Sequence, residues 1–256
     1  NQYPLFNNQN PYIPGSDQGY HLGTLPAMFE PLIMFNVITG EHENWLAETW
    51  EYNQDHTVIT MTLRQGIEWS DGHPLTTKDV AFTFELLKQN AGSMVHLADL
   101  PEFFDSTQVI DERTFRLVLN QPGPAFWAST LSSSHGVHIL PEHIWKDVDP
   151  LEFTNHDIEA GLPLGTGPYQ LVYASPYQKI YDLRKDWWAA RTGFQRLPRV
   201  ERIIYVPQQD ESQAAQLLLT DQLDMGFIMQ VLTLESVLER NDQIMTFTER
   251  EPPYGY

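Results

Sequence analysis

The sequence contains no cysteine among its 256 residues. This absence excludes structural disulfides, zinc sites with cysteine ligands and thiol catalysis in this chain. It does not by itself identify the compartment in which the protein works.

Long apolar runs are missing as well. No stretch approaches the roughly 18 apolar residues of a membrane span. The chain opens on NQYPLFNNQN, which has neither the basic n-region nor the apolar h-region of an export signal. Either the protein is cytosolic or its export segment has been removed.

Basic residues are scarce, because 15 Lys and Arg face 34 Asp and Glu, for a formal charge of -19. Phosphate binding needs a basic surface, so nucleic acid is not expected as a partner, and anionic lipid head groups are disfavoured. Solubility is the plain explanation of such acidity. The length and the 41% hydrophobic content predict a globular protein with one large or two ordinary domains.

Catalytic and metal-binding motifs are also absent. Ser132–His135 places hydroxyls beside an imidazole without the G-x-S-x-G elbow of a serine hydrolase. His138 and His143 are five residues apart, a spacing that does not align two ligands on one helical face. Gly165–Gly167 satisfies neither nucleotide-binding glycine pattern. The sequence therefore predicts no catalytic residues, no metal site and no cofactor.

The stretch from residue 58 to residue 89 carries the clearest local signals. Apolar and polar residues alternate over 58–63, as in a half-buried strand. Ser70-Asp71-Gly72 is a turn signal, and Thr76 with Asp79 predicts a capping box at the start of a helix. The apolar face of that helix comprises Val80, Phe84 and Leu87.

The rest of the chain predicts a mixture of strands and helices. Residues 1 to 25 are rich in Asn, Pro and Gly and read as a loop. Strands are expected at residues 107–110, 114–119, 169–173, 179–183, 202–206, 223–227 and 244–248. Helices are expected at residues 125–131, 139–145, 213–219 and 232–238, with Pro141 in the first turn of the second.

One motif resembles a known signature. The pattern LRxGIxWSDGxPLTxxDVxFTF is similar to that of the family 5 extracellular solute-binding proteins of ABC transporters, which include oligopeptide, dipeptide, nickel and some oligosaccharide receptors. Its matching positions are Leu63, Arg64, Gly66, Trp69, Asp71, Gly72, Pro74, Leu75, Asp79, Val80 and Phe82. Further blocks that resemble the family are Phe29–Leu32, Trp45–Trp50, Ile139–Ile144, Gly165–Tyr169 and Asp221–Asp224, where Asp221 replaces the usual Gly.

The resemblance implies an α/β (α+β mixed) fold. A periplasmic-binding-protein-like lobe, with a mixed β-sheet flanked by helices, would comprise residues 1–50 and 165–256. Residues 51–164 would form an inserted, smaller α+β subdomain that carries the signature. Family members are considerably longer, so the resemblance implies an N-terminal portion whose second lobe is missing.

The implied function is that of the substrate-binding component of an ABC importer. It would capture a peptide between two lobes and deliver it to the permease, without enzyme activity, as a monomer in the periplasm or at the cell surface, with a lipid anchor as an option in the full-length protein. The same role for an oligosaccharide such as a cellobiose-like sugar stays open. Nickel is less favoured because no ligand cluster is recognised, and a secreted hydrolase is the alternative of another class.

The resemblance also implies ligand-binding residues. They lie in the loop around Gly19, at the end of the strand expected before residue 230, and in the inserted subdomain. They are Tyr20, His21, Gly226, Phe227, Met229 and Gln230, together with Trp127, His96 and Met94 from the inserted subdomain. Backbone groups at strand ends can pair with an extended peptide. Aromatic residues can equally stack on sugar rings, and the candidates for this are Tyr12, Tyr20, Trp127 and Phe227.

Overall fold

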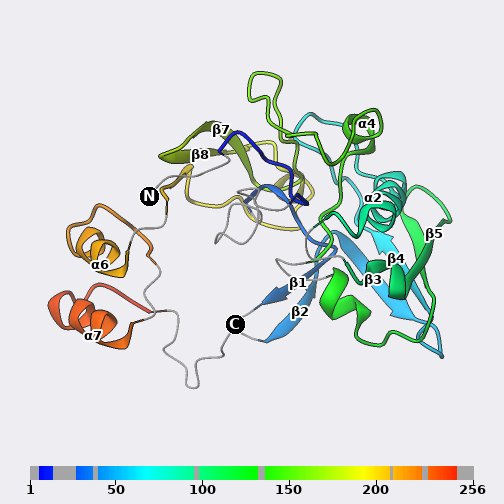
Figure 1. Cartoon of the computed structure of the whole chain (residues 1–256), viewed down its shortest axis with the longest axis horizontal. Coiled ribbons are helices and arrows are strands. Elements are labelled where there is room, and N and C mark those ends of the chain that lie inside the picture. Colours follow the sequence, from blue (N-terminus) through cyan, green and yellow to red (C-terminus); the bar gives the residue numbers. More distant parts are fainter. Residues whose placement is uncertain are drawn as a thin grey trace. The chain divides into compact units, whose positions relative to one another are not determined.

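The computed structural model describes residues 6–13, 27–36, 40–94, 98–131, 136–207, 210–226 and 230–246. The chain divides into two compact units, Gln2–Val206 and Pro207–Tyr256, which are described separately. Helices and strands are mixed along the chain (Figure 1), so the predicted α/β (α+β mixed) class is confirmed. None of the described helices has the length and apolar character needed to cross a bilayer.

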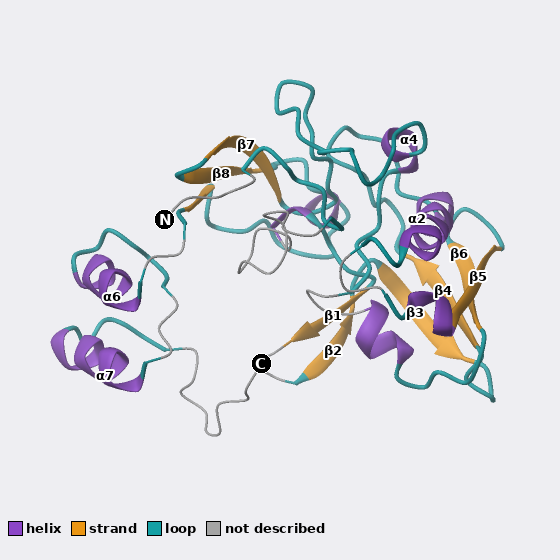
Figure 2. Ribbon diagram, viewed as in Figure 1, coloured by secondary structure: helices purple, strands orange, loops and turns teal. Residues whose placement is uncertain are grey.

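The strands described in the larger unit form antiparallel sheets, which Figure 2 shows in orange. The first is a ribbon of β1 (Ile33–Asn36) and β2 (Glu41–Asn44). The second has the order β3-β4-β6-β5, comprising β3 (Ala47–Tyr52), β4 (Val58–Leu63), β6 (Thr114–Leu119) and β5 (Phe104–Val109). The third has the order β7-β8-β9, comprising β7 (Tyr169–Ser175), β8 (Gln178–Leu183) and β9 (Arg202–Tyr205).

The helices are mostly short. Those described in the larger unit are α2 (Thr77–Asn90), α3 (Leu100–Phe103), a π-helix (Trp127–Leu131), α4 (Glu142–Trp145) and α5 (Trp188–Arg191). The smaller unit holds α6 (Glu211–Leu219) and α7 (Val231–Arg240). The predicted helix at 125–131 is therefore a π-helix, and Pro141 precedes α4 as its N-cap instead of lying in its first turn.

The start of α2 confirms the predicted capping box. Thr76 is extended, and its hydroxyl accepts a hydrogen bond from the backbone N–H of Lys78 at 3.3 Å. In return, Oδ2 of Asp79 accepts the backbone N–H of Thr76 at 2.8 Å. These bonds satisfy donors that a helix start otherwise leaves unpaired. The helix therefore begins where the sequence predicts.

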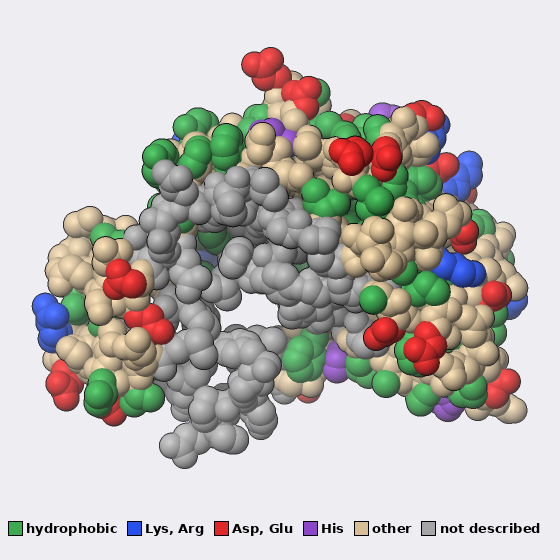
Figure 3. Space-filling view, viewed as in Figure 1, with side chains coloured by type: hydrophobic (Ala, Val, Ile, Leu, Met, Phe, Trp, Pro, Cys, Tyr) green, Lys and Arg blue, Asp and Glu red, His purple; other side chains and the backbone are tan. Residues whose placement is uncertain are grey.

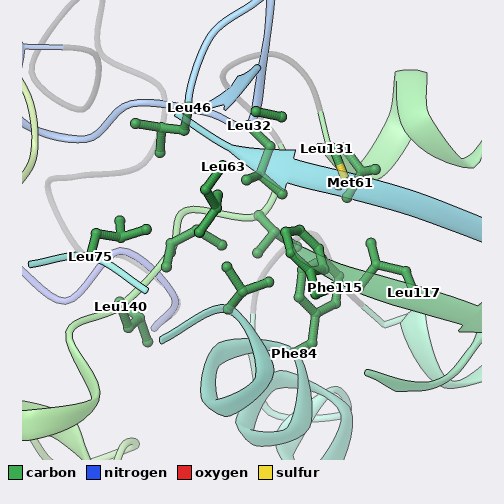
Figure 4. Packing of buried hydrophobic residues seen from close by; sticks show 14 of the residues in the cluster. Leu32, Leu46, Met61, Leu63, Leu75, Phe84, Phe115, Leu117, Leu131 and Leu140 are labelled. Atoms are coloured by element: carbon green, nitrogen blue, oxygen red, sulfur yellow. The ribbon is translucent and has the colours of Figure 1, made fainter. Parts of the chain in front are cut away.

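The main hydrophobic core lies between α2 and the four-stranded sheet (Figure 4). Burial alternates along β4, and the predicted apolar face of α2 is fully buried. Phe84 lies 5.1 Å from Phe104 between ring centroids. The same cluster takes in Leu32 and Leu46 from the first 50 residues and Trp188 from beyond residue 164. The two predicted parts of the larger unit thus share one core, and the domain boundaries stay a prediction.

A tight turn before β7 explains the Gly-Thr-Gly motif. Gly167 donates its N–H to the carbonyl of Met28 at 2.7 Å. A Cβ on Gly165 would lie 2.1 Å from that same carbonyl oxygen, and a Cβ on Gly167 would lie 2.6 Å from the carbonyl oxygen of Ala27. The backbone at residues 165–167 therefore packs directly against the backbone of Ala27 and Met28, and a side chain at either glycine would clash. Arg184 stabilises the turn, because its Nη1 donates to the carbonyls of Gly165 and Gly167 at 3.2 and 3.0 Å.

A buried carboxylate lies close to this turn. Glu30 accepts the indole N–H of Trp45 at 2.9 Å on one oxygen and that of Trp188 at 2.7 Å on the other. Burial raises the pKa of Glu30 to about 7, although the two indoles, the Thr166 hydroxyl and the charge of Arg184 all lower it. Glu30 therefore ties its own segment to the connection between β2 and β3 and to α5, at a cost in desolvation.

The two strands predicted in the smaller unit are not found over their described residues. Residues 223–226 form a bend and coil, not the strand expected at 223–227, and residues 244–246 are also coil. A strand needs a neighbour to accept its hydrogen bonds, and the described residues of the smaller unit are otherwise helices and turns. Asp221 takes a φ of +54°, the region that the Gly of the family pattern would favour. Residues 227, 247 and 248 lie outside the described residues.

Acidic side chains are dispersed over the face of the molecule that Figure 3 shows. On the face shown in Figure 3, Asp and Glu side chains lie among polar and apolar ones, with Lys and Arg between them. A dispersed distribution of this kind supports the solubility interpretation of the charge and offers no single acidic patch on that face.

Candidate functional site

Trp127 belongs to a row of aromatic rings at the junction of β1, β2, β3 and the π-helix. Its indole lies 4.1 Å from the ring of His42, nearly perpendicular to it, and 5.4 Å from Trp50, measured between centroids. Phe35 extends the row at 4.8 Å from His42, and Tyr52 extends it at 6.2 Å from Trp50. These five residues are called the aromatic row below.

Local structure explains why these rings meet. Phe35 and His42 are directly paired across the β1–β2 ribbon, and Trp50 and Tyr52 are two residues apart on one face of β3. The hydroxyl of Tyr52 donates to the carbonyl of Gly123 at 2.7 Å. It also accepts the backbone N–H of Trp127 at 3.4 Å. The π-helix is therefore fixed beside β3.

The aromatic row keeps access to solvent. Phe35, Trp50, Tyr52 and Trp127 are partly buried, and His42 is exposed. Burial raises the pKa of Tyr52, so this phenol stays neutral at physiological pH, although its hydrogen bond with Trp127 lowers the pKa. Half-buried rings held by neighbouring contacts offer an apolar face with little conformational entropy to lose. Such a surface can bind an apolar side chain or the face of a sugar ring.

Gly226 and Gln230 lie in the smaller unit and precede α7, with Gln230 as the N-cap of that helix. The backbone N–H of Gln230 donates to Oε2 of Glu211 at 2.7 Å, which ties the start of α7 to the start of α6. A Cβ on Gly226 would lie 3.0 Å from Leu218, so this glycine packs against α6. A groove of mixed polar and apolar lining runs between the two helices, and the residues that line it are Ser212, Ala215, Gln216, Leu219, Leu232, Thr233, Ser236, Val237 and Arg240.

The other predicted positions divide into two groups. Tyr20, His21, His96, Phe227 and Met229 lie outside the described residues, so their role as ligand contacts stays a prediction.

Met94 and Tyr12 are buried in the core instead of facing solvent. The hydroxyl of Tyr12 donates to the carbonyl of His138 at 2.5 Å and accepts its backbone N–H at 2.7 Å. Burial raises the pKa of this phenol, although the hydrogen bond with His138 lowers it. Stacking of Tyr12 on a sugar, as the sequence suggested, does not fit this position.

One group of side chains with metal-ligating atoms is not evident from the sequence. Asp71, His73 and His143 place a carboxylate oxygen and two imidazole nitrogens within 4.8 Å of one another. The described residues thus bring together possible ligand atoms that the sequence does not reveal, and the expected absence of a metal site stays a prediction. Asp71 and His73 lie two residues apart in the turn, but nothing in the sequence places His143, 72 residues later, beside them.

A solved structure shares this fold over part of its length. The periplasmic oligopeptide-binding protein of an oligopeptide ABC transporter from Thermotoga maritima superposes with a TM-score of 0.71 at 29% identity, over 84% of this chain and 39% of that one. A mannohexaose-bound structure of the same protein gives a TM-score of 0.70, over 83% and 38%. The architecture is therefore that of a periplasmic binding protein.

The family follows from the sequence match. The model of the bacterial extracellular solute-binding proteins, family 5 middle region, matches residues 41–256. The chain belongs to this family, which confirms the resemblance found in the signature. The dipeptide-binding protein of Escherichia coli is 26% identical over 228 residues, covering 79% of this chain and 39% of that protein. Matches to curated relatives cover 22% to 39% of those proteins' own length.

Proposed function

We propose that the protein is the solute-binding subunit of an ABC importer and that its solute is a peptide. The family match over residues 41–256 is the observation that carries this proposal. The names of the relatives from Escherichia coli and Thermotoga maritima, a dipeptide-binding and an oligopeptide-binding protein, support the class of solute. In such a receptor two lobes close on the solute, and the closed state is recognised by the permease. No bond is made or broken.

Backbone geometry suits an extended peptide. β3 and β5 are the outer strands of the four-stranded sheet, and β7 and β9 are those of the three-stranded sheet. The outer side of such a strand presents N–H and C=O groups that an added chain can pair with. The aromatic row offers an apolar surface for peptide side chains. Affinity would then come from backbone hydrogen bonds, and selectivity from the side-chain contacts.

An oligosaccharide is the second candidate solute. The aromatic row favours it, because adjacent half-buried rings can stack on sugar faces. The mannohexaose-bound relative from Thermotoga maritima supports this alternative at 29% identity. The receptor role would be unchanged.

The receptor role also implies a cellular location and a partner protein. We infer export to the periplasm or the cell surface, with a lipid anchor as one means of retention, and a permease of an ABC transporter as the partner. The monomeric state stays a prediction. A secreted hydrolase would need a catalytic constellation, and one sequence candidate, Ser132–His135, lies outside the described residues.

Thermal unfolding of the full-length protein separates the candidates. A solute that binds the native state raises the unfolding temperature by mass action. A panel of short peptides is compared with a panel of oligosaccharides at equal concentrations. We expect peptides to raise the unfolding temperature; a rise with oligosaccharides alone selects the second candidate, and no rise with either refutes both. Recovery of cleaved solute after prolonged incubation would contradict a receptor without catalysis.

The role of the aromatic row is tested by Trp127→Ala, with Tyr177→Ala as the matched loss of an exposed ring in the β7–β8 turn. Trp127→Ala should weaken binding of the identified solute about tenfold or more, in line with the loss of a stacked aromatic contact. Tyr177→Ala should leave the affinity unchanged. Equal affinity in both variants would remove the aromatic row from the site.

A further inference from the structure

Asp71, His73 and His143 form a compact group on the larger unit, called the Asp71 cluster below. Oδ2 of Asp71 lies 3.0 Å from Nδ1 of His73 and 2.8 Å from Nε2 of His143. The two imidazole rings stack with centroids 4.3 Å apart and an angle of 24°. One carboxylate oxygen thus faces two ring nitrogens that converge on it from neighbouring positions.

The turn after Trp69 presents two of these side chains. Gly72 takes a φ of +87° and donates its N–H to the carbonyl of Trp69 at 2.9 Å. Oδ1 of Asp71 accepts the backbone N–H of His73 at 3.0 Å. Because Oδ1 is occupied within the turn, Oδ2 is the oxygen directed to the two imidazoles. The local fold therefore orients the carboxylate before any ligand arrives.

The third side chain is fixed by Asp79. This buried carboxylate accepts the backbone N–H of Thr76 on Oδ2 at 2.8 Å and that of Glu142 on Oδ1 at 2.9 Å. It joins the start of α2, directly after the turn, to the start of α4, which carries His143. A second bond, from the backbone N–H of Leu140 to the hydroxyl of Thr83 at 2.9 Å, holds the approach to α4. Both halves of the Asp71 cluster are therefore anchored on α2.

The spacing suits a small cation with nitrogen ligands. A tetrahedral ion with bonds of about 2.1 Å needs ligand atoms about 3.4 Å apart. The two distances to Oδ2 fall short of this by about half an ångström, a movement that exposed side chains can make by small torsion changes. Two imidazoles and one carboxylate favour Zn²⁺, Ni²⁺ or Cu²⁺, whereas Mg²⁺ and Ca²⁺ prefer oxygen ligands.

We propose that Asp71, His73 and His143 bind one divalent transition-metal ion through Oδ2, Nδ1 and Nε2. The side chain of His73 is 62% exposed, so the remaining coordination positions face solvent and hold water or a donor from another molecule. Each imidazole binds as the neutral ring, with its proton on the other nitrogen. The site is independent of the solute that the receptor carries.

Metal titration tests the site directly. The full-length protein, without a polyhistidine tag and stripped with a chelator, is titrated with Zn²⁺ by calorimetry. We expect one equivalent of Zn²⁺ to bind. His73→Ala and His143→Ala should each weaken binding about 100-fold, because loss of a group that only supports a metal ligand already costs about 10- to 100-fold in affinity. His56→Asn is the matched control, because His56 is exposed with a φ of +58°, which Asn tolerates. This control should bind Zn²⁺ like the unaltered protein.

A spectroscopic readout separates coordination from folding. Co²⁺ bound with few ligands absorbs visible light more strongly than hydrated Co²⁺, and this band should appear with the unaltered protein and His56→Asn. It should disappear in His73→Ala while the circular dichroism spectrum stays the same, since this side chain is largely exposed. Absence of Zn²⁺ binding at micromolar concentrations, or equal binding by the cluster variants and the control, would overturn the proposal and leave a hydrogen-bonded cluster only.

Discussion

Glu30 should make the stability of the larger unit depend on pH. Its side chain is buried, with 4% of the residue exposed, and both carboxylate oxygens accept indole N–H groups. Burial raises the pKa of Glu30 from 4.5 to about 7, against the hydrogen bonds that lower it. The folded state therefore holds a proton more tightly than the unfolded chain, which links proton binding to folding.

Because folding raises the pKa of Glu30, the contribution of this residue to the free energy of unfolding falls as the pH rises. Below pH 4.5 the carboxyl is protonated in both states and contributes its full share of stability; between pH 4.5 and 7 this share is lost as the pH rises. Above pH 7 the loss is complete. A change from 4.5 to about 7 corresponds to about 3 kcal/mol at 1.36 kcal/mol per unit.

The perturbation is Glu30→Gln, which keeps the shape and removes the titration. The amide presents one acceptor to two indole donors, so one N–H from Trp45 or Trp188 loses its partner at about 1–3 kcal/mol. That cost does not change with pH. The variant should therefore be less stable than the unaltered protein at pH 5 by about 1–3 kcal/mol. Between pH 5 and pH 8 the unaltered protein loses about 2.5 kcal/mol of its contribution from Glu30, so the difference should vanish or reverse by pH 8.

Denaturant unfolding of both proteins at several pH values between 5 and 8 measures this difference. All other titratable groups are common to both proteins, so their contributions cancel in the comparison. Parallel pH profiles for the unaltered protein and the Glu30→Gln variant would refute the reasoning. Such a result would mean that the indole, hydroxyl and guanidinium groups lower the pKa of Glu30 by as much as burial raises it.

Two further substitutions test the packing and the helix start. Gly165→Ala should cost about 3 kcal/mol or more in unfolding free energy, because its Cβ would lie 2.1 Å from the carbonyl oxygen of Met28. Gly92→Ala is the control, since no atom lies within 4 Å of its Cβ position, and a loss of equal size there would contradict the close-contact explanation. Thr76→Ala should cost about 1 kcal/mol through the lost cap, and Thr76→Ser should restore most of it; equal stability of the Ala and Ser variants would show that the hydroxyl contributes nothing.

The sequence predicted local structure well where the stabilising contacts join residues that are close in sequence. The capping box of Thr76 and Asp79, the alternation along β4 and the connection between β5 and β6 each depend on residues close in sequence. The strand expected at 223–227 failed for the opposite reason. Its apolar pattern was compatible with a strand, but strand formation depends on a distant partner that the pattern does not reveal.

The candidate site was less predictable because its parts converge from distant segments. Trp127 was predicted as a ligand contact through resemblance, yet its neighbours His42 and Trp50 come from β2 and β3. The sequence predicts no metal-binding role for His143, because its spacing from His138 does not place the two side chains on one helical face. The structure places it instead beside Asp71, a contact across 72 residues that no local periodicity encodes.

Asp79 shows how a signature residue can serve two levels of structure. The capping-box pattern accounts for only one of its oxygens, the one that accepts the N–H of Thr76. The other oxygen accepts the N–H of Glu142 and thereby fixes α4 against the start of α2. Burial raises the pKa of this carboxyl, whereas both backbone hydrogen bonds lower it, so its contacts favour the charged form that burial opposes. An Asp is therefore required at this position for tertiary reasons as well as for capping, and the position of His143 depends on the contact that the sequence pattern does not predict.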